Sequence, residues 1–471
     1  MINNRLKNLF WIFLEKIGLI VLSFIAFYFF AKYLSVDDYG IGVLAIVIVE
    51  FIGMFFSGLW SDPLVRRSTK VAESYSSVFW IGGLGVIILM PVFNLGILYF
   101  TNNRELALLT SIASIKVLAV VLARPFVAQL RRDKNFKLLA VRTLLGKVVG
   151  AVVGIVLAIN GFGALAVVSQ IVVMQVLELL VLIWGNSGLI RSRVELTLFI
   201  KLSREGIPIA VKDVLTGGLV KGTIIILGFT TSPTIIGYFA FANRLIDLPF
   251  NSIRNGVKSY VIPVMARRSE VDQNIGPLMS NLTFATAVFT LPIFIMISTV
   301  GPPYISLLFD GNWDSAIPIF QYIGFLACIK LFFLYHGIAL VSIGKGKIGV
   351  WLEISNTIVT LVITFLLSPI YGLAGVVISL GINLIFDVII KIYSLVGLIE
   401  YDIKKYFYDL LKVSLSGIIM LLVIIQNQSF FDTNIYISTF FTIITGFISY
   451  ILSLIIFRFT FNRYIKLALE K

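Results

Sequence analysis

The chain has 471 residues, of which 59% are hydrophobic and only 13% are charged. A soluble domain has about 25% charged residues, so this composition excludes an ordinary soluble protein and indicates a membrane protein. The formal net charge of +14 is distributed over short polar segments without a nucleic-acid-binding motif, so it indicates anionic membrane lipid and no nucleic acid as partner. The single cysteine, Cys328, excludes an intramolecular disulfide and a cysteine-based metal site.

Fourteen apolar stretches follow one another along the chain, each about as long as the roughly 20 helical residues that cross a bilayer. Runs such as 43–49 and 117–122 lack the alternation of barrel strands, so the spans are predicted to be helices. The fold class is therefore an all-α polytopic membrane protein. The predicted spans are 11–34, 41–60, 78–100, 106–127, 138–159, 163–184, 206–229, 234–262, 280–301, 316–342, 347–368, 371–397, 407–426 and 435–458.

Basic residues alternate between rich and poor connecting segments. The segments after the second, fourth and sixth spans contain several, whereas those around Ser232, Gly311, Pro369 and Gln428 contain none. Because cytoplasmic segments retain Lys and Arg, both termini are predicted to be cytoplasmic. The first apolar run has no small-residue cleavage site, so we interpret it as an uncleaved first helix.

An internal repeat is predicted from two helix pairs. In each, a short polar loop precedes a glycine, Gly40 or Gly237, and an apolar helix then ends in a doubled arginine, 66–67 or 267–268. Six helices separate equivalent points, so the two halves would share one orientation in the membrane. We predict a six-helix lobe at 1–200, a second at 201–400 and an additional helix pair at 401–471.

Several ionisable residues fall within the predicted spans, where a charge costs roughly 2.5–3.5 kcal/mol to insert. Snorkelling explains those near cytoplasmic ends, and Arg244 and Asp247, three residues apart, could neutralise each other. Deep lysines and arginines have little interface to reach, which favours a hydrated cationic cavity for an anionic substrate. The predicted substrate-binding residues are Lys116, Lys212, Lys221, Arg244, Arg254 and Lys330.

Acidic residues in the spans are candidates for ion coupling. They are Glu178, Asp213, Asp247 and Asp387. No GxxxxGK[ST] loop for ATP, no catalytic grouping and no metal-ligand cluster occurs in the sequence, so no cofactor or metal is expected and transport would be driven by a gradient.

The seventh and eighth spans contain residues that disturb regular helices. The seventh has Pro208 and the pair Gly217–Gly218, and the eighth has Pro249. Such helices suit a mobile, hydrated interface between lobes, although glycine also permits close helix packing.

Four segments together carry a family resemblance. They are YLSVDDYGIGVLAIVIVEFIGMFFSGLWSDPLVRR near the start, ARPFVAQLRRDKNFKLLA after the fourth span, GYFAFANRLIDLPFNSIRNGVKSYVIPVMAR in the eighth and LFDGNWDSAIPIFQYIGFLACIK before and within the tenth. In order and spacing, over about residues 1–400, the chain resembles polysaccharide and O-antigen flippases of the MOP (multidrug/oligosaccharidyl-lipid/polysaccharide) superfamily, the colanic-acid-type exporters among them.

The resemblance implies a V-shaped pair of lobes that works by alternating access in the bacterial inner membrane. It implies an undecaprenyl-pyrophosphate-linked oligosaccharide as substrate, moved from the cytoplasmic to the periplasmic leaflet, with polysaccharide polymerase and glycosyltransferases as possible partners. The predicted cations would then face the pyrophosphate.

Two other functions compete with this one. A multidrug exporter of the same superfamily would favour acids in the N-terminal lobe, where Glu50 and Glu178 are the main ones, but the deep charges here are mostly basic. A membrane glycosyltransferase or polymerase could use Asp37–Asp38 as a base or metal site, but it needs larger outer loops than this chain has.

Overall fold

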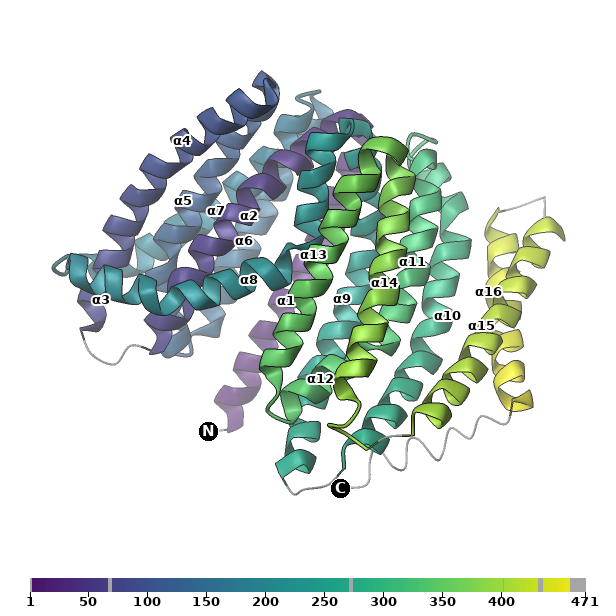
Figure 1. Ribbon diagram of the computed structural model, residues 1–471. Coiled ribbons are helices and arrows are strands. Elements are labelled where there is room, and N and C mark those ends of the chain that lie inside the picture. The colour runs from purple at the N-terminus through teal and green to yellow at the C-terminus, as the bar shows by residue number, and fades with distance from the viewer. Residues whose placement is uncertain (1, 67–69, 271–273, 401, 431–434, 458–471) are drawn as a thin grey trace. The chain divides into compact units, whose positions relative to one another are not determined.

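The computed structural model describes residues 2–66, 70–270, 274–400, 402–430 and 435–457, and these are almost entirely helical (Figure 1). Each of the fourteen predicted spans is largely helical in the described residues, which confirms the predicted fold class. Arg67 of the first doubled arginine, Met1 and the predicted cytoplasmic C-terminal end at 458–471 lie outside these ranges.

The chain forms two compact units, an N-terminal unit, Met1–Ala240, and a C-terminal unit, Phe241–Lys471. The lobes predicted at 1–200 and 201–400 are defined by a different criterion, the number of helices in each half of the repeat. They stay a prediction. The N-terminal unit contains α1 (Ile2–Tyr33), α2 (Val36–Arg66), α3 (Val71–Ser77), the π-helical turn η1 (Val78–Gly82), α4 (Gly83–Thr101), α5 (Arg104–Arg132), α6 (Phe136–Ile159), α7 (Ala164–Asn186), the 3₁₀ turn η2 (Ser187–Ile190), α8 (Leu196–Thr230) and the start of α9 (Pro233–Glu270).

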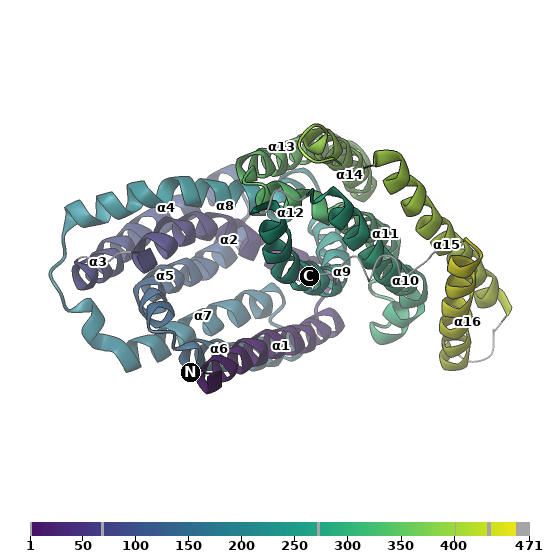
Figure 2. The same ribbon diagram turned by 90° about the horizontal axis from the view of Figure 1, so that it is seen from below.

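The remaining helices belong to the C-terminal unit, in which α15 and α16 pack on each other and against α10 (Figure 2). The tenth predicted span is interrupted at Phe333, between two helices. The helices are α10 (Gly276–Leu308), the 3₁₀ turn η3 (Asp314–Ala316), α11 (Ile317–Phe332), α12 (Leu334–Ser342), α13 (Gly346–Tyr371), α14 (Leu373–Leu395), α15 (Ile403–Phe430) and α16 (Ile435–Ile456).

Twelve helical segments of the described chain are long and apolar enough to cross a membrane, so the protein is multi-pass. The two other predicted spans, now α8 and α9, fall outside that set and contain most of the predicted cationic residues. α8 is bent (Figure 1), and Pro208 and Gly217–Gly218 are the residues in it that relax helix geometry. These two helices therefore differ from the other twelve segments in hydropathy and charge.

Glycine allows α2 to approach α8 and α9 at both of its ends. A Cβ at Gly40 would lie 2.1 Å from the Pro233 carbonyl oxygen, and a Cβ at Gly237 would lie 2.4 Å from that of Val36. The Thr234 hydroxyl donates to Asp37 at 2.5 Å beside this crossing. The two glycines aligned by the predicted repeat thus lie at the same helix crossing. Each contacts the backbone of the residue that lies four positions before the other glycine in the sequence.

Gly206 makes the tightest contact at the other end of α2. A Cβ there would lie 1.7 Å from the Leu59 carbonyl oxygen, which belongs to backbone and has little room to shift. We expect Gly206→Ala to lower the unfolding free energy by about 1–3 kcal/mol or more, as overpacking does. Thermal unfolding of the purified protein in detergent measures this.

Gly85→Ala is the matched control, because Gly85 is also helical and has nothing within 4 Å of the added methyl group. There we expect no loss, and a gain of up to about 1 kcal/mol from the unfolded chain. Equal thermal stability of the two variants would contradict the close packing of α2 on α8.

Candidate substrate site

A carboxylate near the middle of α2 binds two lysines from other helices. Glu50 accepts hydrogen bonds from the ammonium groups of Lys116 on α5 and Lys221 on α8. The three side chains are 26%, 17% and 27% exposed, so they are neither dry nor free in solvent. One negative and two positive charges leave this group, the Glu50 cluster, with a net positive charge.

Glycines explain how Lys221 reaches Glu50. Cβ atoms at Gly217 and Gly218 would contact Met54 and Phe51 of α2, so the absence of side chains there lets α8 lie against α2. Glycine thus allows close packing of α8 on α2, which is one of the two interpretations of this pair.

Further basic groups lie along the same part of the N-terminal unit. Arg124 of α5 donates to Ser57 and Ser61 of α2 at 2.7 and 3.0 Å. Glu50, Ser57 and Ser61 are separated by seven and four residues and share one face of α2. Arg124 uses neutral oxygens, so its positive charge is not cancelled by these contacts.

Glu178, a predicted coupling residue, is buried on α7 and paired with Arg142 of α6 at 3.8 Å. The pairing is possible because Gly146, one turn after Arg142, makes room for the Glu178 side chain. Lys212 and Asp213 differ from all of these, because both are exposed on α8 and the structure does not bring them to the Glu50 cluster.

The C-terminal unit has its own group of charges. Asp247 on α9 lies within electrostatic range of Arg244, Arg254 and Lys330, the last from α11. Arg244 and Asp247, expected as a possible neutral pair, make no direct ion pair. The Arg254 guanidinium lies over the Phe250 ring at 5.6 Å, on the same helix. Asp247 therefore lies near three cations without a direct ion pair to any of them, and Lys330 is also within electrostatic range of Asp387.

Lys330 is the most informative member of this group. Its side chain is half-buried in α11, and its ammonium makes neither an ion pair nor a hydrogen bond with the residues that the structure describes. An ammonium without a direct ion pair inside a membrane-spanning helix is costly and calls for a hydrated or ligand-bound environment.

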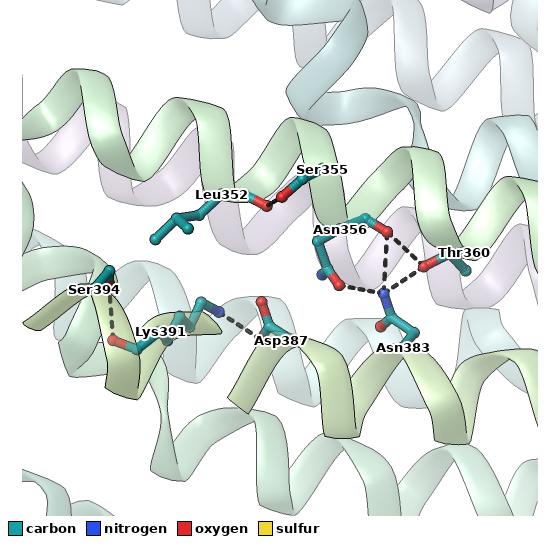
Figure 3. A network of polar contacts seen from close by, with 8 residues as sticks. All are labelled: Leu352, Ser355, Asn356, Thr360, Asn383, Asp387, Lys391 and Ser394. Carbon is teal, nitrogen blue, oxygen red and sulfur yellow. Dashed lines mark hydrogen bonds and ion pairs between the residues drawn. The ribbon is translucent and has the colours of Figure 1, made fainter. Parts of the chain in front are cut away.

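Asp387 is compensated within its own helix. Figure 3 shows its carboxylate accepting from Lys391, one turn later on α14, at 2.5 Å. One turn earlier, Asn383 donates to Asn356 at 2.8 Å and to Thr360, both on α13. Thr364 and Ser379 continue the row at 2.8 Å. Hydrogen bonds between side chains thus join α13 to α14, as in many membrane helix pairs.

The prediction from sequence therefore found the lysines but missed their partner. From the sequence, Glu50 stands out only as an acid that a drug exporter could use, and the predicted site includes neither Arg124 nor Arg142. Glu50 is the tenth residue of its predicted span and Lys116 the eleventh of its own, so similar depth is the signal that could pair them.

Residues 29–318 match the family described as polysaccharide biosynthesis protein (Polysacc_synt_3), which is more than half of the chain. The chain belongs to this family. The match confirms the resemblance seen in the sequence, and it spans both the Glu50 cluster and the charges of α9.

Two proteins similar to this chain are the succinoglycan biosynthesis transport protein ExoT of Rhizobium meliloti and the teichuronic acid biosynthesis protein TuaB of Bacillus subtilis. The first is 22% identical over 75% of this chain and 72% of its own length. The second is 18% identical over 74% of this chain and 73% of its own length.

Solved structures show the same fold at low identity. The lipid II flippase MurJ, in an inward closed conformation, superposes with a TM-score of 0.75 at 18% identity, covering 94% of this chain and 98% of MurJ. An inward-facing multidrug resistance MATE transporter of the MOP superfamily gives 0.60 at 15% identity, covering 84% and 94%. The fold is that of MOP-superfamily transporters.

Proposed function

We propose that this chain is a flippase that moves an undecaprenyl-pyrophosphate-linked oligosaccharide from the cytoplasmic to the periplasmic leaflet of a bacterial inner membrane. The family membership supports a role in polysaccharide biosynthesis. The names of two similar proteins, a succinoglycan transport protein and a lipid II flippase, support transport of a polysaccharide precursor on a lipid. The chain is a transporter on this proposal and catalyses no reaction.

The observation that carries the proposal is the excess of positive charge inside the helices. Lys116 and Lys221 share Glu50, and Lys330 has no direct partner among the described residues. Basic residues are retained in membrane helices where they serve a function. A pyrophosphate, with its dense negative charge, is a suitable ligand for such groups.

Glu50 gives the N-terminal unit a way to bind and release that ligand. In its absence both lysines bind the Glu50 carboxylate, which offsets only one of their two positive charges; a pyrophosphate would compete with Glu50 for their ammonium groups. The binding free energy of the pyrophosphate is thus the difference between its contacts with the lysines and the contacts that Glu50 gives up. This difference keeps the affinity for the substrate moderate and permits its release on the other side of the membrane.

The predicted coupling acids remain part of the proposal. Glu178 and Asp387 are ion-paired with Arg142 and Lys391, so an ion that binds either acid must compete with a basic residue. Asp213 and Asp247 have no such direct pair. Alternating access and a driving ion gradient belong to this proposal, as do two cytoplasmic termini.

The competing functions are disfavoured by specific features. A multidrug exporter that favours cationic drugs would meet a predominantly basic site, and the match to MATE transporters extends to the fold alone. A glycosyltransferase or polymerase needs donor and acceptor space outside the membrane, whereas the described connections, such as 102–103 and 231–232, are short.

Lipid analysis of the host after deletion of this chain tests the proposal. We expect undecaprenyl-pyrophosphate-linked oligosaccharide to accumulate on the cytoplasmic side while surface polysaccharide is lost, and re-expression of the chain to reverse both. Complete, normally exported glycan together with altered drug efflux would instead assign the chain to drug export.

A further inference from the structure

A cavity of about 850 Å³ lies between α4 and α5, away from the charged residues described above. Its lining runs from Val86 to Leu98 on α4 and from Arg104 to Leu118 on α5. Most of the lining is apolar, and Ile87, Leu95 and Leu108 are each more than half exposed. In a bilayer such side chains face lipid, so this α4–α5 groove opens towards acyl chains.

The groove is a few Å longer than the hydrocarbon part of one leaflet. At 1.5 Å per residue the lining spans about 18–21 Å along the two helices, against roughly 15 Å for half of the hydrocarbon core. About midway along it Asn94 of α4 donates to Ser114 of α5 at 3.1 Å, which holds the two helices at a defined spacing. The groove thus extends from one interface to about the bilayer centre.

A positive charge lies at the shallow end. Arg104 is the first residue of α5 and lines the groove, and the helix N-terminus adds its own partial positive charge there. The charge pattern predicts this end to be on the outer side, where basic residues are rare. Glu105, the next residue, does not line the groove, because adjacent residues point to different sides of a helix.

We propose that the α4–α5 groove binds an anionic glycerophospholipid of the leaflet on the Arg104 side. Its phosphate contacts Arg104 and the start of α5, and an acyl chain lies along the groove to the level of Asn94 and Ser114. A glycerophospholipid fits better than a long polyprenyl lipid, because the groove ends at one leaflet's depth. This site is separate from the transported substrate and does not depend on the proposed function.

Native mass spectrometry of the purified full-length protein, with added phosphatidylglycerol or phosphatidylcholine, tests the site. We expect phosphatidylglycerol to bind more tightly, and Arg104→Gln to weaken it about fivefold, as one basic residue near an anionic lipid surface does. The matched control is Lys32→Gln, which removes an exposed charge at the end of α1 on the same predicted side, and should leave binding unchanged.

Ser111→Phe provides a second test, because Ser111 lines the groove at an exposed position and a phenyl ring there would fill it. We expect this variant to lose bound phosphatidylglycerol while it remains monodisperse. Three results would overturn the proposal: equal binding of both lipids, unchanged binding in both variants, or displacement of phosphatidylglycerol by undecaprenyl phosphate at equal concentration.

Discussion

Lys330→Met is expected to lower polysaccharide export about 10- to 150-fold without reducing the amount of protein in the membrane. A charge-assisted hydrogen bond contributes about 1.5–3 kcal/mol, and each 1.4 kcal/mol corresponds to a factor of ten in binding. Because the Lys330 ammonium has no direct partner among the described residues, its loss breaks no ion pair, and Asp387 keeps its direct pair with Lys391. The effect should therefore appear in transport and leave folding unaffected. Surface polysaccharide per cell, normalised to membrane protein abundance, is the measurement.

Two controls separate a binding role from a general need for charge. Lys330→Arg keeps the positive charge and should retain most export. Lys412→Met removes a half-buried lysine of the same unit whose ammonium lies 4.4 Å from the Tyr408 ring centre, and should export normally. Arg244→Ala and Lys116→Ala, tested beside Lys330→Met, extend the experiment to the other predicted cations. Normal export by all three at normal abundance would refute the cationic site.

Glu50→Gln is expected to lower the unfolding free energy of the protein by about 2–4 kcal/mol, because it leaves Lys116 and Lys221 close together with no compensating charge. Removal of one partner from a fully buried ion pair costs about 3–5 kcal/mol, and the partial exposure of these three side chains lowers that cost. Thermal unfolding in detergent, followed by the monodisperse fraction after heating, gives the change.

The triple variant Glu50→Gln, Lys116→Met, Lys221→Met should recover the lost stability, since no unpaired charge remains. It should not recover export, because the two lysines are proposed to bind the substrate. Glu195→Gln is the matched control: Glu195 pairs with Lys70 at 3.2 Å, but that lysine is 57% exposed, so the change should cost less than about 1 kcal/mol. A Glu50→Gln protein as stable as the Glu195→Gln protein would show that the Glu50 cluster does not bear on folding.

Much of the fold could be read from the order of residues. The spans around Val43–Val49 and Val117–Leu122 are long apolar runs, and a bilayer leaves helices as the solution for such runs. The family resemblance was likewise carried by local segments such as 237–267. The ion pair of Asp387 and Lys391 was also within reach, because both residues lie one turn apart on a single helix.

The Glu50 cluster could not be predicted in the same way. Its lysines are 66 and 171 residues from Glu50 along the chain. Whether a deep lysine meets a carboxylate depends on how each helix is rotated and how closely it packs, and Gly217–Gly218 decide this for α8 only in combination with Phe51 and Met54 of α2. The depth of a residue in the membrane, by contrast, depends only on its position along its own helix, and the hydropathy of the sequence shows that position.

By itself, then, the sequence determined that this is a helical multi-pass protein of the polysaccharide biosynthesis family with an excess of deep positive charge. The tertiary structure alone decided which of those charges have a direct partner: Lys116 and Lys221 share Glu50, and Lys330 has no direct partner among the described residues. The physical reason is that insertion energy depends on each segment separately, whereas charge compensation depends on distances of a few Å between side chains of different helices.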